Sequence, residues 1–273
     1  MKTYSPITDL SIYPSINQIH GSDRTSSRYT FIPTQRIINI LDNQGWKVSA
    51  IMEKQSRKDN LRGFGDHLVR FRREQDFGIS AVIGEHVPEI VLTGSHDGTS
   101  AWEMMFGLFR FVCGNGAMVA EGQYAGHKIR HVGFQDQNVI DAVADVIETA
   151  PRILDRVKAW EALPLERAER LALAEASVVA KYGDEGLAKM DIERLAAPTR
   201  REDAEPNLWT TYNVLQEKLV ERGGRFAVNS NSGRRTRFKQ AQGISSVSEN
   251  VRVNQALWML ADKMAQLKGA VAN

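Results

Sequence analysis

Side chains that can do acid–base or metal chemistry gather in one stretch, LTGSHDGTSAWEMMFGLFRFVCGNG, which runs from Leu92 to Gly116. A histidine beside an aspartate can act as a general base with an orienting carboxylate, or the pair can bind a metal ion. His96 and Asp97, with Glu103 further along, are therefore candidates for a metal-dependent nuclease or hydrolase. Adjacent side chains rarely converge on one ion, however, and the stretch has no HExxH or CxxC spacing.

The same stretch has a second interpretation, as a capped and buried helix. Ser100 and Glu103 stand three residues apart just before an apolar run, which is the capping-box pattern. A helix that is apolar on most sides must be buried, and the Gly-Asn-Gly sequence at 114–116 suits its end. We therefore expect a helix over about 99–113, which favours a structural over a catalytic role. Cys113 is a weaker nucleophile candidate because its apolar context would raise the thiol pKa.

Composition places the chain among ordinary globular proteins. Its 273 residues are 42% hydrophobic and 25% charged, enough for one large domain or two small ones. The single cysteine excludes internal disulfides and favours a reducing compartment. No apolar run is long enough for a signal peptide or a membrane span, so we expect a cytoplasmic protein with no membrane association. The net charge of +2 is too small to indicate nucleic acid by itself.

The hydrophobic pattern predicts an α+β fold. Residues 1–27 are rich in Ser, Pro, Asn and Asp without a period, which predicts a poorly ordered, flexible N-terminal arm. The core, residues 28–134, begins with a short helix from Thr34 to Gly45. Alternating or short apolar runs predict three strands at 46–52, 67–74 and 87–94, with a weaker extra hairpin at 117–122 and 127–133. The expected order is helix, three strands and helix around a small antiparallel sheet.

From about residue 135 the pattern becomes helical. Apolar residues recur at helical spacing through 136–163, where Pro151 should break or kink the helix. Further stripes of apolar residues mark helices near 208–219 and 257–267. We therefore expect residues 135–273 to form a helical C-terminal half that contains one basic flexible loop at 222–240.

A first basic cluster lies around the second expected strand. Lys54, Arg57 and Lys58 crowd the connection before it, and Arg70 and Arg72 alternate on one of its faces. An exposed strand face with two arginines beside a basic loop can follow a phosphate backbone, so these residues are expected to line a groove for nucleic acid. The alternative is a solvated face, because acidic residues are interleaved with the basic ones.

The segment 222–240 holds the second basic cluster. It contains no acidic residue, and its basic residues are Arg222, Arg225, Arg234, Arg235, Arg237 and Lys239. Glycine, serine and asparagine would make it flexible, and Phe226 and Phe238 could stack on bases. We expect Arg234, Arg235, Arg237 and Lys239 to clamp nucleic acid from this loop. A disordered, solvated linker is the alternative.

Several motifs resemble a known family. RYTFIPT, LVRFRR, VPEIVLTGSHDGTSAWEMMFGLFRFVCGNG, NLWTTYNVLQEKL and NQALWMLAD are similar to the YfjQ/YafZ-type family, a domain-of-unknown-function family of phage, prophage and plasmid proteins. The resemblance covers roughly residue 28 to the end. It departs at Gly94, where the family usually carries asparagine. The family brings no established activity.

The expected element order is also similar to the core of single-strand annealing proteins, the RecT, Redβ and Erf group. This resemblance is one of fold and implies rings or filaments that hold a single strand in a basic groove. The leading hypothesis is therefore a mobile-element protein that binds single-stranded DNA, as an annealing or recombination factor. It would form a homo-oligomer and need no cofactor. The alternatives are the metal-dependent nuclease or hydrolase, and a protein-interaction factor that counters host defence.

Overall fold

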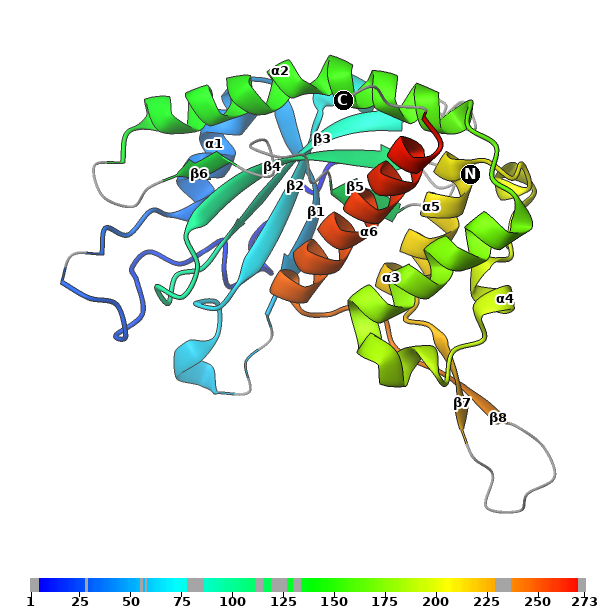
Figure 1. Ribbon diagram of the computed structural model, residues 1–273. Coiled ribbons are helices and arrows are strands. Elements are labelled where there is room, and N and C mark those ends of the chain that lie inside the picture. The colour runs from blue at the N-terminus through cyan, green and yellow to red at the C-terminus, as the bar shows by residue number, and fades with distance from the viewer. Residues whose placement is uncertain are drawn as a thin grey trace. The chain divides into compact units, whose positions relative to one another are not determined.

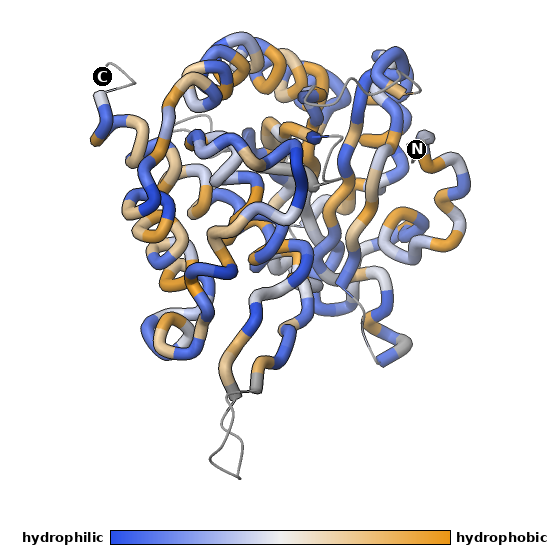
Figure 2. Tube along the Cα trace, turned by 90° about the vertical axis from the view of Figure 1, so that its right-hand side faces the viewer, coloured by the Kyte–Doolittle hydropathy of each residue, from blue (hydrophilic) through white to orange (hydrophobic). Residues whose placement is uncertain are grey.

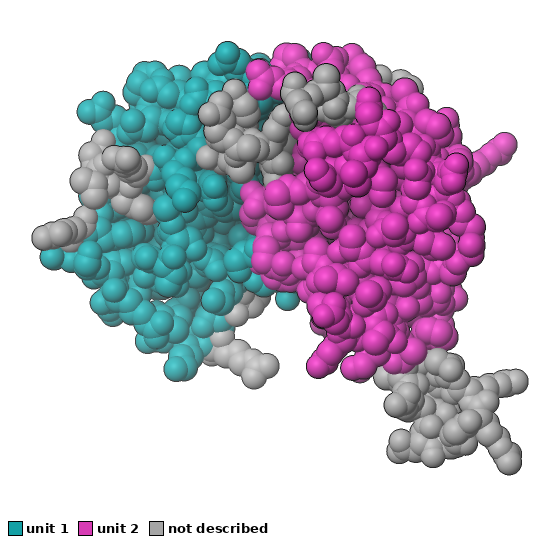
Figure 3. All heavy atoms as spheres, in the orientation of Figure 1, with its two compact units in different colours: residues 1–110, 121–150, 245–248 teal, residues 111–120, 151–244, 249–273 magenta. Residues whose placement is uncertain are grey.

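The computed structural model describes residues 5–27, 29–54, 56, 58–77, 86–110, 115–118, 127–129, 134–228 and 237–269 (Figure 1). The chain divides into two compact units (Figure 3). Unit 1 comprises residues 1–110, 121–150 and 245–248, and unit 2 comprises residues 111–120, 151–244 and 249–273. Each unit has its own buried core.

Unit 1 is built on an antiparallel sheet. Its strands are β1 (Trp46–Glu53), β2 (His67–Arg73), β3 (His86–Gly94), β4 (Trp102–Arg110) and β6 (His127–Ile129), paired in the order β1-β2-β3-β4-β6. Short 3₁₀ turns, η1 (Asp59–Leu61) and η2 (Glu74–Asp76), flank β2. This confirms the α+β class and the three strands expected at 46–52, 67–74 and 87–94.

One face of this sheet packs against two helices, α1 (Thr34–Asn43) and the first part of α2 (Asp136–Glu161). Ile90 and Phe106, on the same face, line a pocket of about 270 Å³ together with Val146 of α2. The N-terminal residue of α1, Thr34, bonds to the His67 side chain of β2. Each fully buried aliphatic or aromatic side chain in such a layer contributes roughly 1.5–3 kcal/mol through the hydrophobic effect. This layer positions α1 over the ends of β2 and β3.

The stretch expected as a helix over 99–113 is instead strand β4, as far as the structure describes it. All of its residues from 104 to 110 are buried, on both sheet faces alternately. A strand buried on both faces gives a continuous apolar run, which periodicity cannot distinguish from a buried helix. The capping-box residues have other roles: the Ser100 hydroxyl donates to Asp66, and Glu103 lies opposite Thr93 in the sheet.

The segment expected to be a poorly ordered arm is packed onto unit 1 over residues 5–27. Ile16 is fully buried, and the Ser15 hydroxyl and backbone N–H both donate to the Glu53 carboxylate. The backbone N–H of Ile7 donates to the Val48 carbonyl at 2.8 Å, beside the bulged strand β1. The arm lacks a hydrophobic period because it forms turns rather than a helix or strand, so its buried residues are irregularly spaced.

Two smaller expectations also change. Residues 127–129 form β6, which pairs with β4, while β5 (Asn115–Met118) belongs to unit 2, so the hairpin expected at 117–122 and 127–133 is wrong where it is described. Helix α2 continues through Pro151 instead of ending there. Proline removes one backbone hydrogen bond, and the buried residues Ile153, Val157 and Trp160 on the C-terminal side supply packing that offsets this loss.

Unit 2 confirms the helical C-terminal half. It contains the rest of α2, α3 (Arg167–Leu187), α4 (Ile192–Ala196), η4 (Arg201–Asp203), α5 (Leu208–Gln216) and α6 (Val247–Leu267) from Glu249 onwards. Trp160, Trp209, Tyr212 and Trp258 form its aromatic centre, with the Trp160 and Trp258 ring centroids 4.5 Å apart. After α5 the chain continues as a π-helical turn, η5 (Glu217–Glu221).

The segment expected as a flexible loop at 222–240 contains a β-hairpin. β7 (Arg225–Val228) pairs antiparallel with β8 (Arg237–Gln240), and the two lie side by side in Figure 1. Within the part of the chain that the structure describes, no helix is long and apolar enough to cross a membrane.

Candidate functional site

His96 lies in a buried hydrogen-bonded cluster rather than at a surface. Its side chain is 0% exposed, and its Nε2 atom lies 2.8 Å from Thr34 Oγ1 and 3.0 Å from the Ser15 carbonyl. The same threonine hydroxyl lies 2.9 Å from Nε2 of His67 on β2. Three separate segments of unit 1 thus meet at Thr34: α1 itself, β2 through His67 and the turn after β3 through His96. We call His67, His96, Thr34 and the Ser15 carbonyl the histidine clasp.

The hydrogen bonds of the clasp fix where its protons lie. A carbonyl oxygen can only accept, so Nδ1 of His67 donates to Gly65 and its Nε2 accepts from the Thr34 hydroxyl. By the same argument Nε2 of His96 donates to the Ser15 carbonyl. The neutral His67 ring is then held in one tautomer. Burial lowers the pKa of His67 to about 4. The clasp joins the N-terminal segment, α1 and β2, and a substrate outside the molecule does not reach it.

Asp97 and Glu103 also have structural surroundings. Asp97 begins the turn between β3 and β4, where its carboxylate accepts from the Thr99 backbone N–H at 3.0 Å and Gly98 adopts a φ of 77°. Glu103 lies on β4 opposite Lys128 of β6. Among the described residues, no group of three or more His, Cys, Asp or Glu side chains could hold a metal ion.

Arg70 and Arg72 do not form an exposed basic face, contrary to the sequence-based expectation. Both are buried and donate to one carboxylate, that of Glu89 on β3, which is itself 1% exposed. The Arg70 Nη1 to Glu89 Oε2 distance is 2.7 Å, and Arg72 Nε lies 2.6 Å from Oε1. The Arg72 guanidinium also lies 3.4 Å from the ring centroid of Phe109. Two guanidinium groups and one carboxylate thus form a buried ion triad.

Local backbone features make room for this triad. A register shift in β1 between Val48 and Ala50 marks a bulge, and the Ser49 hydroxyl at this point donates to Glu89 at 3.0 Å. On β4, Gly107 lies opposite Glu89. A Cβ atom at this position would lie 2.7 Å from a Val91 methyl group and 3.4 Å from Arg70 Nη1, so only glycine leaves space for the ion triad.

The remaining basic residues of the first cluster lie around the turn after β1. Lys54 and Lys58 are exposed in unit 1. Arg57 lies outside the described residues. Among the described residues, the exposed part of this cluster therefore consists of lysines in a loop, and Arg70 and Arg72 have a partner inside the protein.

In the second cluster, the hairpin separates side chains onto two faces. Arg225 pairs with Gln240 and Ala227 with Phe238 on one face, while Phe226 pairs with Lys239 on the other. Phe226 packs edge-on against Tyr182, with ring centroids 4.8 Å apart. Lys239 is exposed, whereas Arg234, Arg235 and the side chain of Arg237 lie outside the described residues. Figure 2 shows apolar and hydrophilic residues together along the hairpin.

A pocket of about 630 Å³ opens at the base of this hairpin, within unit 2. We call it the hairpin pocket. The residues that give it its chemistry are Arg194, Lys218, Arg222, Arg225, Phe238 and Gln240. Among the described residues that line it, the only acidic one is Asp191, whose carboxylate accepts from the backbone N–H of Arg194 at the start of α4. Cationic side chains thus dominate the pocket, with one aromatic ring among them.

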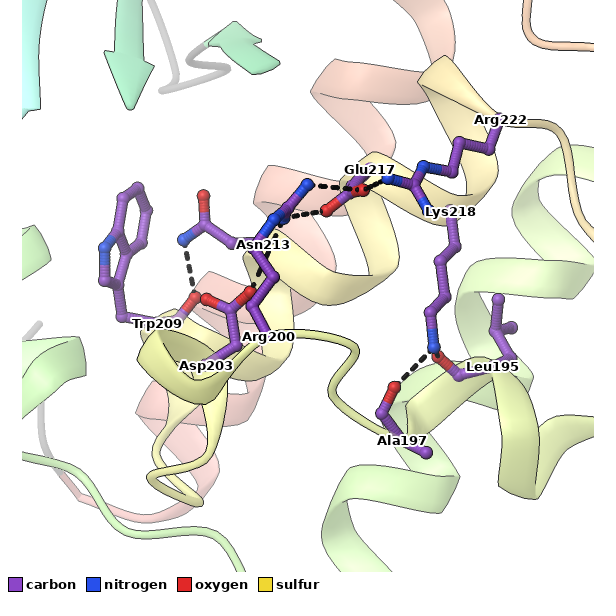
Figure 4. A network of polar contacts seen from close by, with 9 residues as sticks. All are labelled: Leu195, Ala197, Arg200, Asp203, Trp209, Asn213, Glu217, Lys218 and Arg222. Atoms are coloured by element: carbon purple, nitrogen blue, oxygen red, sulfur yellow. Dashed lines mark hydrogen bonds and ion pairs between the residues drawn. The ribbon is translucent and has the colours of Figure 1, made fainter. Parts of the chain in front are cut away.

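Figure 4 shows the polar network that positions two of these cations. Glu217 is buried at the start of the π-helical turn and accepts from both Nη atoms of Arg200, with the Nη2 contact at 2.8 Å. Arg222 adds a third contact, from Nη2 to Glu217 Oε1 at 2.7 Å. Arg200 also lies 3.7 Å from the Asp203 carboxylate. The buried Glu217 carboxylate therefore forms ion pairs with two guanidinium groups.

Lys218 has a different role from its neighbour Arg222. Its ammonium group donates to the carbonyls of Arg194, Leu195 and Ala197, at the C-terminal end of α4. Because an ammonium has three donors, these contacts use all of them. Burial lowers the pKa of Lys218 to about 8. Lys218 therefore contributes positive charge to the pocket wall, while its donors hold α4 in place.

Part of this pocket can be predicted from the sequence. Arg222, Arg225 and Phe238 are basic and aromatic residues of one segment. Arg194 and Lys218 cannot be predicted in this way, because they come from α4 and the π-helical turn and approach the hairpin only in the folded unit. The one available signal was RGGR at 222–225, where arginines flank a glycine pair that ends a helix.

Fold and site together define a two-unit α+β protein with a buried ion triad in one unit and a cationic pocket in the other. The chain belongs to the family described as Domain of unknown function (DUF932), whose match spans residues 22–258. It is similar to the UPF0380 protein YfjQ of Escherichia coli K12, at 30% identity over 262 residues, which cover 95% of this chain and 92% of the relative. The UPF0380 protein YafZ of the same organism is 29% identical over 262 residues, with the same coverage.

No solved structure matches the chain. The family expected from the sequence is thus confirmed, whereas the similarity to single-strand annealing proteins stays a prediction.

Proposed function

We propose that this protein binds single-stranded nucleic acid and that the hairpin pocket is a principal contact. The observation that supports the proposal is the combination of arginine side chains and an exposed aromatic ring in one pocket. Phe238 is 38% exposed although it is a large apolar side chain. Phosphates are neutralised by guanidinium groups, and unpaired bases stack on aromatic rings.

The form of the pocket favours a single strand over a duplex. Paired bases are stacked inside a double helix, so an aromatic ring in a pocket contacts a base only when the strand is unpaired or the base is flipped. Lys54 and Lys58, which are exposed, remain candidates for further phosphate contacts. Binding of this kind needs no cofactor, because charge neutralisation and stacking are sufficient.

We expect binding to single-stranded DNA to weaken steeply with salt. With three to five phosphate contacts, the logarithm of the association constant should fall with the logarithm of salt at a slope of about −2 to −3.5, or about 15- to 130-fold between 50 and 200 mM. Fluorescence anisotropy of a labelled oligothymidine measures this directly. The matched control is a duplex of equal length, which should bind more weakly. Absence of binding at 50 mM, or binding that is indifferent to salt, contradicts the proposal.

Within this proposal, strand annealing is the process that the binding would serve. A protein that neutralises phosphates and leaves strands flexible speeds the pairing of complementary strands. We expect two complementary oligonucleotides, labelled as a fluorescence-transfer pair, to anneal faster with the protein than without it. If the protein binds each strand and slows pairing instead, strand protection replaces annealing as the function.

A further inference from the structure

We infer that the hairpin pocket holds one nucleotide of the bound strand. Its base stacks on Phe238 and its phosphate binds Arg222, which breaks its ion pair with Glu217 to make that contact. This inference rests on the proposed single-strand binding and specifies how that site works. The hairpin pocket has a volume of about 630 Å³, which lies within the range of roughly 300–1,000 Å³ that is typical of small-molecule sites.

One face of the β7–β8 hairpin lines the hairpin pocket. Arg225, Phe238 and Gln240 line it, and all three lie on the same face of the β7–β8 pair. The Arg225 guanidinium lies 5.1 Å from the centroid of the Phe238 ring, so a flat cation already uses this ring as a stacking partner. A nucleobase is flat in the same way and can take this position or extend the stack.

The side chain of Arg222 is 56% exposed. It is held by Glu217, and this carboxylate is itself 4% exposed. If Glu217 had no other partner, releasing Arg222 would leave a buried charge uncompensated, at a large cost. Arg200, however, donates to both oxygens of the same carboxylate. Arg222 can therefore move to a phosphate while Glu217 keeps a bidentate partner.

The neighbouring lysine, Lys218, cannot take this role. Lys218 directs its ammonium group to three backbone carbonyls of the α4 end, and moving it would leave those carbonyls without these bonds. Arg222 is set apart from it by the π-helical turn, in which the backbone N–H of Arg222 donates to the Glu217 carbonyl at 3.0 Å. π-helical turns occur frequently at functional sites. Arg222 is therefore the exchangeable cation and Lys218 the fixed one.

The test compares pocket variants with a control of equal charge change at an exposed position of unit 2 outside the pocket. Arg222→Ala should weaken binding of a labelled oligothymidine by about tenfold at 50 mM salt and reduce the salt slope by about 0.7. Phe238→Leu should weaken it by about 5- to 100-fold with an unchanged slope. Lys263→Ala removes an exposed charge from α6, outside the residues that line the pocket, and its effect should stay below about threefold.

A second probe isolates the stacking contact. An oligonucleotide of the same length with abasic sugars keeps the phosphates and lacks the bases. Phe238→Leu should weaken binding of the thymidine strand and leave binding of the abasic strand unchanged relative to the wild type. Equal losses for both strands would show that Phe238 supports the fold of the hairpin and does not stack on a base.

The outcomes separate this inference from the proposed function. If the wild-type protein binds no single strand, the proposed function fails. If it binds with a steep salt dependence but Arg222→Ala and Phe238→Leu behave like Lys263→Ala, binding stands and the nucleotide pocket is wrong. Thermal unfolding of each variant identifies one that has lost its fold. Arg222→Lys and Phe238→Tyr then replace it: the lysine variant should lose affinity despite its charge, and the tyrosine variant should retain it.

Discussion

Replacing Glu89 with alanine is expected to lower the free energy of unfolding by about 3–5 kcal/mol. Its carboxylate is the shared partner of Arg70 and Arg72, at 2.7 and 2.6 Å. Removing it leaves two guanidinium groups away from water, one of them against the Phe109 ring. Urea unfolding measures the effect as a lower midpoint with an unchanged slope.

Two controls test whether the loss of stability comes from the two buried guanidinium groups that no longer have the Glu89 carboxylate. Asp155→Ala breaks an exposed pair with Lys158, in which the side chains are 75% and 73% exposed, and should cost no more than about 1 kcal/mol. The triple substitution Arg70→Met, Arg72→Met and Glu89→Met removes all three charges, and should recover most of the stability that Glu89→Ala loses. A Glu89→Ala protein as stable as the wild type would contradict the ion triad.

The same triad shows what the sequence could and could not predict about the sheet. Alternation of apolar and charged residues correctly placed β2, because the backbone of a strand turns successive side chains to opposite faces. It could not tell that the charged face of β2 is buried. The partner of Arg70 and Arg72 stands on another strand, 19 and 17 residues away in the chain, so only the pairing of β2 with β3 brings them together. From the sequence alone, a charged strand face therefore indicates a surface that contacts solvent or nucleic acid.

The prediction for the stretch that forms β4 was wrong for the opposite reason. Its residues are apolar on both faces, so no alternation remained to mark a strand, and a chance capping-box spacing favoured a helix. Gly107 in the middle of the run was a signal against a helix, since it lowers helix propensity and marks close approach in a strand. For the hairpin pocket, the sequence contributed the basic and aromatic residues of 222–240. The contributions of α4 and of the π-helical turn depend on tertiary packing, which local patterns do not record.

We expect acid to destabilise unit 1 through His67. The pKa of this histidine is lowered to about 4 by burial, whereas an unfolded histidine titrates near 6.5. Between these values the unfolded chain binds a proton that the folded protein does not. Stability should therefore be fully present above about pH 6.5 and fall as the pH is lowered toward 4, by roughly 3 kcal/mol in all. Chemical unfolding at a series of pH values from 7.5 to 4 measures this slope.

The hydrogen-bond directions of the clasp give this prediction its control. Because Nε2 of His67 accepts from Thr34 and Nδ1 donates to Gly65, protonating the ring places a second donor against a hydroxyl that donates its own proton to this nitrogen. His67→Gln removes the titrating group, so its stability should be lower at pH 7.5 and change less between pH 6.5 and 4. His20→Gln, at an exposed position, should keep the wild-type slope. An unchanged acid slope in the His67 variant would mean that other groups set the acid sensitivity, and that the clasp does not hold this ring neutral.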